Sequence, residues 1–242
     1  MQWAGALAAA GFLAALATNL VGIGGGLLVM PFLALMFDAR QAVVLAAPVF
    51  LVNAVSAFVY HWRDIEGPRP WILLPGTLVG ILAAGHLLRT ESFRELRLII
   101  GAVALAFVVL QGYALVAERQ IRGLPLWTGV PLGLAAGGVS TLSNIGGTLA
   151  SMYLLDRDQQ PAAFIAGVSL FYVISSVVKV TYFVTSGLLP LPDLLRVGPA
   201  VPAVLAGAWV GARINRRVPR RTFAFVVLGV IASASGLLFL QA

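Results

Sequence analysis

The sequence has no cysteine and few charged residues, and each absence excludes a class of protein. Without cysteine there is no disulfide, iron–sulfur cluster or thiol chemistry. Only 10% of the 242 residues are charged, against roughly 25% in an ordinary soluble domain. The two histidines, His61 and His86, are a poor basis for a zinc site. We therefore expect no soluble enzyme, no metal and no cofactor.

Apolar residues fill most of the chain. They make up 60% of it, and the mean hydropathy is +0.96. The net charge of +7 comes from 15 Arg and one Lys against nine acids. Basic residues without polar surface around them are typical of anchors at a membrane, not of a nucleic-acid interface. The expected partner is the lipid bilayer, with no nucleic acid.

Long Leu-, Ala-, Val- and Gly-rich runs predict an all-α polytopic membrane bundle, because a bilayer satisfies no open sheet edge. About eight segments are expected, in two membrane repeats covering residues 1–118 and 119–242. The predicted segments are 3–37, 42–61, 70–88, 96–117, 125–155, 162–186, 191–213 and 222–241. The start of the chain lacks the basic region of a signal peptide, so we expect it to be retained.

The distribution of Arg predicts the topology. The loops after the odd-numbered segments hold ten Arg, and the loops on the opposite side hold four. The positive-inside rule then places both termini outside the cytoplasm. The first and fifth segments would be roughly 52 and 46 Å long as straight helices, against a hydrocarbon core of about 30 Å. Each is therefore expected to be broken, tilted or re-entrant, and the Arg count does not decide between these forms.

The two halves resemble each other. Ile23-Gly24-Gly25-Gly26 precedes Ile145-Gly146-Gly147-Thr148 by 122 residues, and Thr18-Asn19 aligns with Ser140-Thr141. A Gly-Pro turn follows in each half, at Gly67 and at Gly187. Repeats of this kind are common in secondary transporters, where the substrate binds at the repeat interface.

The Gly-rich motifs lie in the middle of the first segment of each repeat. Three consecutive glycines cost roughly 3 kcal/mol of helix propensity relative to alanine. We expect a helix break at each motif, where a new helix N-terminus would face an anion. The other possibility is close packing of helices, which we expect for Gly129, Gly133 and Gly137, for Gly76 and Gly80, and for Gly207 and Gly211.

Lys179 is the one clear charge inside a predicted span, because all nine acids lie in loops or at segment ends. A cation transporter would be expected to place a carboxylate there. A lone buried cation favours the substrate as its counter-ion; snorkelling of Lys179 to the interface is the alternative. Polar side chains of lower weight include Asn53 with Ser56, the hydroxyl-rich stretch from Ser169 to Ser176, His61 and Gln111. For His61 we expect an interfacial anchor rather than a ligand, and for the others helix packing is the alternative to a contact with the substrate.

The segment from Asn19 to Pro31, NLVGIGGGLLVMP, resembles the N-terminal signature of the TauE/SafE sulfite exporter family, also called the 4-toluene sulfonate uptake permease family. Ser143-Asn144-Ile145-Gly146-Gly147 fits the second Gly motif of that family, with Thr148 in place of a third glycine and Tyr153 in place of proline. The resemblance implies secondary transport of sulfite, sulfoacetate or another organosulfonate.

These observations predict a multi-pass anion transporter of the bacterial inner membrane, without enzymatic activity. A passive anion channel, or a membrane-embedded enzyme or assembly factor, is the alternative. A small anion is the expected partner, and the chain could pair as a homodimer. The predicted substrate-binding residues are Asn19, Gly24, Gly25, Gly26, Ser143, Asn144, Gly146, Gly147, Thr148, Tyr172 and Lys179.

Overall fold

The computed structural model describes residues 2–21, 25–90, 124–154 and 161–214, together with five single helical positions between 98 and 109. All regular secondary structure in these residues is helical, which confirms the all-α prediction for this part of the chain. The segment predicted at 222–241, and all of 96–117 except those five positions, lie outside the described residues.

In the first half, one helix precedes the Gly-rich motif and one follows it, and two long helices come next. Asp38 caps the helix α3 (Ala39–His61) by accepting hydrogen bonds from the N–H groups of Arg40 and Gln41 at 2.9 and 3.2 Å, the usual role of an aspartate at this position. The elements are α1 (Gln2–Val21), α2 (Gly26–Met36), α3 (Ala39–His61), the 3₁₀ turn η1 (Trp62–Asp64) and α4 (Arg69–Thr90).

The second half has a similar order. Its elements are the 3₁₀ turn η2 (Leu126–Thr128), α6 (Gly129–Ser143), α7 (Gly147–Leu154), α8 (Pro161–Thr185), α9 (Leu191–Arg196) and α10 (Ala200–Ile214). The single span predicted at 191–213 is wrong, because α9 and α10 are separate helices there. Pro199 lies between them, and a proline has no N–H to continue a helix and disfavours helical backbone at the preceding residue.

Three described helices are long and apolar enough to cross a membrane. They cover Arg40–Val59, Arg69–Arg89 and Ala162–Thr185, within α3, α4 and α8. Two shorter apolar stretches, Leu7–Thr18 and Ala200–Gly211, lie in α1 and α10. Large apolar side chains such as Val79, Leu82 and Trp209 are exposed, as expected of a surface that contacts lipid.

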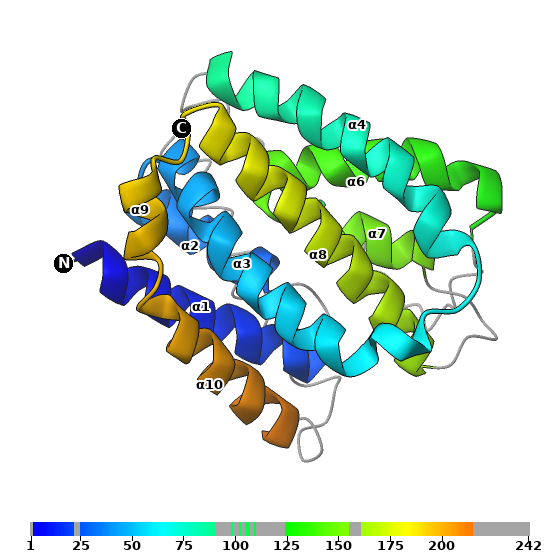
Figure 1. The fold of residues 1–242 in the computed structure, drawn as a ribbon, viewed down its shortest axis with the longest axis horizontal. Helices are drawn as coiled ribbons and strands as arrows, with labels where there is room; N and C mark the ends of the chain where they lie inside the picture. The colour runs from blue at the N-terminus through cyan, green and yellow to red at the C-terminus, as the bar shows by residue number, and fades with distance from the viewer. Residues whose placement is uncertain are drawn as a thin grey trace.

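The long helices pack in a layered bundle (Figure 1). α3 and α8 pack against each other in the middle, α4 pairs with α6 on one side, and α1 pairs with α10 on the other. The packing prediction for four glycines is confirmed. A Cβ atom at Gly76 or Gly80 of α4 would clash with α6 backbone, and one at Gly133 or Gly137 with α4 backbone. Small residues let these two helix backbones approach closely.

The other predicted glycine positions agree in part. A Cβ atom at Gly207 would clash with the carbonyl oxygen of Phe12, so this residue allows α10 to approach α1. At Gly129 the neighbours are the side chains of Ile72 and Tyr153. Gly67 and Gly187 have φ angles of +68° and +75°, which confirms both predicted turns, since glycine adopts this conformation without strain.

Candidate functional site

The gap between α6 and α7 is organised by Asn144. Its φ and ψ angles of 57° and 18° are left-handed, a conformation that asparagine tolerates better than most residues. Its backbone N–H donates to the carbonyl of Ser140 at 2.9 Å and ends α6. Its side-chain amide donates to the carbonyl of Val43 in α3 at 2.9 Å. The chain turns sharply here before α7 begins at Gly147.

Lys179 reaches this turn from the middle of α8. Its side chain is only 2% exposed. The ammonium donates to Asn144 Oδ1 at 2.7 Å, to Ser140 Oγ at 3.0 Å and to the Ser140 carbonyl at 3.1 Å. Three neutral oxygens therefore take its three N–H donors. The snorkelling alternative is wrong, because the ammonium points into the bundle and is held at the C-terminal end of α6.

The charge of Lys179 suits this position. The C-terminal end of a helix carries a partial negative charge, and a cation there is stabilised. Lys179, Ser140 and Asn144 will be called the second junction. It ties α8 to the end of α6, and through Asn144 it also ties α6 to α3.

A corresponding cluster lies at the end of α1. The hydroxyl of Thr18 donates to the carbonyl of Ala14 at 2.8 Å. The Thr18 oxygen accepts from the N–H of Gly25 at 2.8 Å and from the side-chain amide of Asn53 in α3 at 3.2 Å. We call Thr18, Gly25 and Asn53 the first junction. Because Gly25 already donates to Thr18, its N–H is occupied in this arrangement.

The two Gly-rich motifs adjoin each other across the halves. A Cβ atom on Gly26 would clash with the carbonyl oxygen of Asn144, so the start of α2 lies against the turn between α6 and α7. A Cβ atom on Gly147 would clash with the hydroxyl of Tyr172, which belongs to α8. Both glycines are first residues of a helix, where N–H groups have no partner within the helix.

Two predicted hydroxyl donors are occupied by backbone oxygens nearby. Ser143 donates to the carbonyl of Val139 at 2.7 Å, and Thr148 donates to the carbonyl of Ile145 at 2.9 Å. Both side chains are buried. Their oxygens keep lone pairs, so in this conformation they offer acceptors rather than donors.

The structure separates the predicted site residues. Gly25 belongs to the first junction, and the hydroxyls of Ser143 and Thr148 donate to nearby backbone oxygens. The structure brings Gly26 and Lys179 to Asn144, and Gly147, three residues further along the chain, lies against Tyr172. Gly146 lies beside this group, where a Cβ atom would clash with the Ala136 carbonyl. Gly24 lies outside the described residues, and for Asn19 the structure describes the backbone in α1 but not the side chain.

The sequence analysis missed Ser140 and Thr18 as site residues and gave Asn53 low weight. A signal was present for the two hydroxyls, since they occupy matching positions 122 residues apart, four residues after Ala14 and Ala136. Spacing along one helix does not show that Lys179 and Asn53 from other helices reach them. That contact depends on how α3 and α8 cross the bundle.

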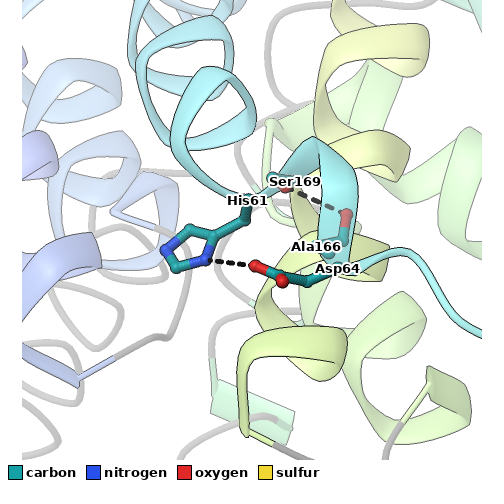
Figure 2. A network of polar contacts seen from close by, with 4 residues as sticks. All are labelled: His61, Asp64, Ala166 and Ser169. Carbon is teal, nitrogen blue, oxygen red and sulfur yellow. Dashed lines mark hydrogen bonds and ion pairs between the residues drawn. The ribbon is translucent and has the colours of Figure 1, made fainter.

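Three other polar side chains of α3 and α8 contact residues three positions away in the chain. Figure 2 shows Ser169 donating to the carbonyl of Ala166, at 3.0 Å, and His61 beside Asp64, with Nδ1 and Oδ2 3.4 Å apart. Ser175 donates to the carbonyl of Tyr172 at 3.2 Å. His61 is partly exposed at the end of α3. These contacts favour helix capping and packing for this set.

The acids that the structure describes lie at helix ends, turns and loops, whereas Lys179 lies in the middle of α8. They are Asp38, Asp64, Glu66 and Asp193. Within the described residues there is no group of three or more histidine, aspartate or glutamate side chains placed to hold a metal ion. The chemistry of the two junctions is that of hydrogen-bond donors, neutral oxygens, helix ends and one ammonium.

Comparison with known proteins identifies a family for this chain. The family model described as Sulfite exporter TauE/SafE matches residues 7–238. Searches of curated proteins and of solved structures returned no match. The family match covers nearly the whole chain, across both Gly-rich motifs and all described helices after the first turn of α1. The chain belongs to the TauE/SafE sulfite exporter family, a family of membrane transporters.

Proposed function

We propose that this protein is a secondary transporter that moves a sulfur-containing anion, namely sulfite, sulfoacetate or another organosulfonate, across the bacterial inner membrane. The anion would bind near the midplane, between the two Gly-rich motifs. The observation that carries this proposal is the contact of Gly26 with the backbone of Asn144. It sets the N-terminal end of α2 against the turn that leads into α7.

Helix N-termini supply the donors in this proposal. The first N–H groups of α2 have no partner within their helix. At the start of α7, the N–H groups of Thr148 and Leu149 donate to the carbonyls of Ile145 and Gly146, each at 3.1 Å, so an anion there would have to displace these bonds. Each helix end carries a partial positive charge that favours an anion. Glycine at the first position lets other protein atoms approach the backbone closely, the Asn144 carbonyl at Gly26 and the Tyr172 hydroxyl at Gly147. Discontinuous helices with ends near the midplane are typical of secondary transporters.

Lys179 contributes through its charge and through Asn144 in this proposal. All three of its N–H donors are held by protein oxygens. A direct contact with the anion would require one of these bonds to be exchanged. The ammonium still places a positive charge behind the turn between α6 and α7, where the dielectric constant is low and charge acts over a longer distance.

The two halves would be structural repeats, covering residues 1–118 and 119–242. The helix contacts support this, because they are reciprocal. The broken element of each half pairs with the third element of the other, as α1 with α10 and α6 with α4, and the second elements α3 and α8 pair with each other. Movement of one half against the other would then give alternating access to the anion.

The central experiment is transport by the purified chain in proteoliposomes. Radiolabelled sulfite uptake should saturate with concentration, and sulfoacetate, taurine, thiosulfate, sulfate and chloride should be compared as competitors. Saturation with competition by sulfonates supports the carrier. Flux that rises linearly without saturation would indicate a passive channel instead.

The Gly26→Ala variant tests the site within that experiment. Its methyl group would meet the carbonyl of Asn144, so uptake should be lost. Gly138→Ala in α6 is the matched control, because the nearest atoms to its new methyl group lie at 3.8 Å and 4.0 Å. Normal uptake by Gly26→Ala would remove the α2 N-terminus from the binding site.

A further inference from the structure

The two junctions share part of their construction and differ in the charge of the side chain that reaches the hydroxyl. In each, an alanine carbonyl of the broken helix lies against a glycine of the following motif: Ala14 against Gly25, and Ala136 against Gly146. Four residues after each alanine is a hydroxyl, Thr18 or Ser140, which accepts a hydrogen bond from the next long helix of its half. The donor is the neutral amide of Asn53 in the first junction and the ammonium of Lys179 in the second.

The second junction is complete. The positive charge of Lys179 stands at the C-terminal end of α6, and each of its N–H donors has an oxygen partner. The Asn144 side chain is also used at both ends, because Oδ1 accepts from Lys179 and Nδ2 donates to the carbonyl of Val43.

The first junction is incomplete. Asn53 is only 7% exposed, and its Oδ1 atom has no hydrogen-bond donor among the described residues. Exchanging the positions of Oδ1 and Nδ2 in the Asn53 amide would not give Oδ1 a donor. Thr18 already donates its one hydrogen to Ala14 and accepts from Gly25, so it has no hydrogen to give to Asn53. A buried acceptor without a donor costs about 1–3 kcal/mol.

The position of this oxygen selects the ligand. Thr18 lies in the last turn of α1, so the Asn53 amide stands beside the C-terminal end of that helix. A helix C-terminus carries a partial negative charge and free carbonyl oxygens. An amide oxygen beside it repels an anion and attracts a cation. Half-helix C-terminal ends of this kind hold Na⁺ or H⁺ in other transporter folds.

We infer that the first junction binds a monovalent metal cation, Na⁺ being the probe of choice, through Asn53 Oδ1 and the end of α1. The cation takes the place that the Lys179 ammonium fills in the second junction. In the second half the positive charge belongs to the Lys179 side chain, whereas in the first half it would come from an ion that exchanges with the solution. The inference rests on the proposed transport function, in which this ion would be the coupling ion that accompanies the anion.

Binding of radiolabelled Na⁺ to the purified full chain in detergent, without any anion, tests the site directly. Wild type should bind Na⁺, and a choline buffer should not displace it. Asn53→Leu should weaken binding roughly tenfold or more, the loss expected for one charge-assisted contact. Ser56→Ala is the matched control one turn further along α3, where the hydroxyl donates to the Asn53 carbonyl at 2.7 Å. It should bind Na⁺ like wild type.

A second variant distinguishes loss of the Asn53 oxygen from misfolding of Asn53→Leu. Asn53→Asp keeps an oxygen at this position and adds a negative charge, so it should bind Na⁺ at least as tightly as wild type. Loss of Na⁺ binding in Asn53→Asp, or equal binding in Asn53→Leu, would overturn the assignment. Absence of Na⁺ binding in wild type would overturn it as well.

Sulfite uptake in proteoliposomes separates this inference from the proposed function. Uptake that needs external Na⁺ and stops in choline supports both. Full uptake in choline, with no bound Na⁺, would refute the cation site and leave the transporter intact. Bound Na⁺ that depends on Asn53, with no sulfite uptake in either medium, would support the site and refute the proposed substrate.

Discussion

The first and second junctions each connect a broken helix to a long helix of the same half, but they do so with different side chains. Each holds a broken helix to the long helix that follows it, through a hydroxyl near the break. In the second, a buried ammonium donates to three oxygens. In the first, a neutral amide leaves one oxygen without a donor among the described residues. The two junctions therefore differ by one unit of charge, and in our proposal that difference separates a fixed structural link from a cation site.

The largest effect is expected from breaking the second junction. Lys179→Met would leave Asn144 Oδ1 and Ser140 Oγ buried without their donor, at about 1–3 kcal/mol for each stranded acceptor. Thermal unfolding in detergent should show a marked loss of stability, and sulfite uptake should fall because the turn into α7 loses its link to α8. Lys179→Arg keeps the charge but changes donor geometry, so it should retain part of both.

A double-mutant cycle sharpens this prediction. Ser140→Ala in the Lys179→Met background removes one stranded acceptor, so the second substitution should cost less than it does in wild type. Strict additivity of the two losses would mean that the ammonium and the Ser140 hydroxyl are not coupled.

The next effect concerns the contact between the halves. Gly26→Ala should destabilise the protein by about 1–3 kcal/mol, the usual cost of forcing atoms into a packed interior, because backbone on both sides must move. Gly147→Ala should cost less, since its methyl group meets the end of the Tyr172 side chain, which can turn away. Parallel unfolding curves for the two variants and for Gly138→Ala would measure this order. A larger loss in Gly147→Ala would reverse it.

A smaller effect is expected from making the second junction resemble the first. Lys179→Asn removes the ammonium and leaves amide and hydroxyl oxygens at the end of α6. Added Na⁺ should then stabilise this variant more than it stabilises wild type, by on the order of 2–4 °C if binding supplies about 1 kcal/mol. The measurement is the unfolding temperature in NaCl against choline chloride. An equal response in both proteins would show that charge at the helix end does not distinguish the junctions.

The smallest effect is expected from Ser143→Ala. The Ser143 hydroxyl donates to the carbonyl of Val139 in its own helix, a bond worth about 0.5–1.5 kcal/mol. The variant should take up sulfite with an unchanged half-saturation concentration. A raised half-saturation concentration with normal stability would mean that Ser143 turns to the anion in another state of the transport cycle.

The sequence by itself determined the architecture and the class of the protein. Apolar runs, scarce charge and glycines spaced four apart led to a helical membrane bundle with close helix contacts, because these properties depend on composition and local periodicity. The GIGGG motif and its counterpart led to the family. The sequence also explains why the single span predicted at 191–213 is wrong. Pro199 indicates a helix end there, but the prediction followed the high apolar content of the whole stretch.

Only the tertiary structure decided what Lys179 and Asn53 contact. The charge census identified Lys179 as unusual, yet both of its sequence-based interpretations, a counter-ion for the substrate or a snorkelling anchor, assumed that the protein offered it no partner. Its partners are oxygens of Ser140 in α6 and of Asn144 directly after it, 39 and 35 residues away in the chain. Asn53 meets Thr18 across 35 residues. Such contacts depend on where helices cross, and the crossing of α3 and α8 is set by packing of the whole bundle rather than by any local pattern.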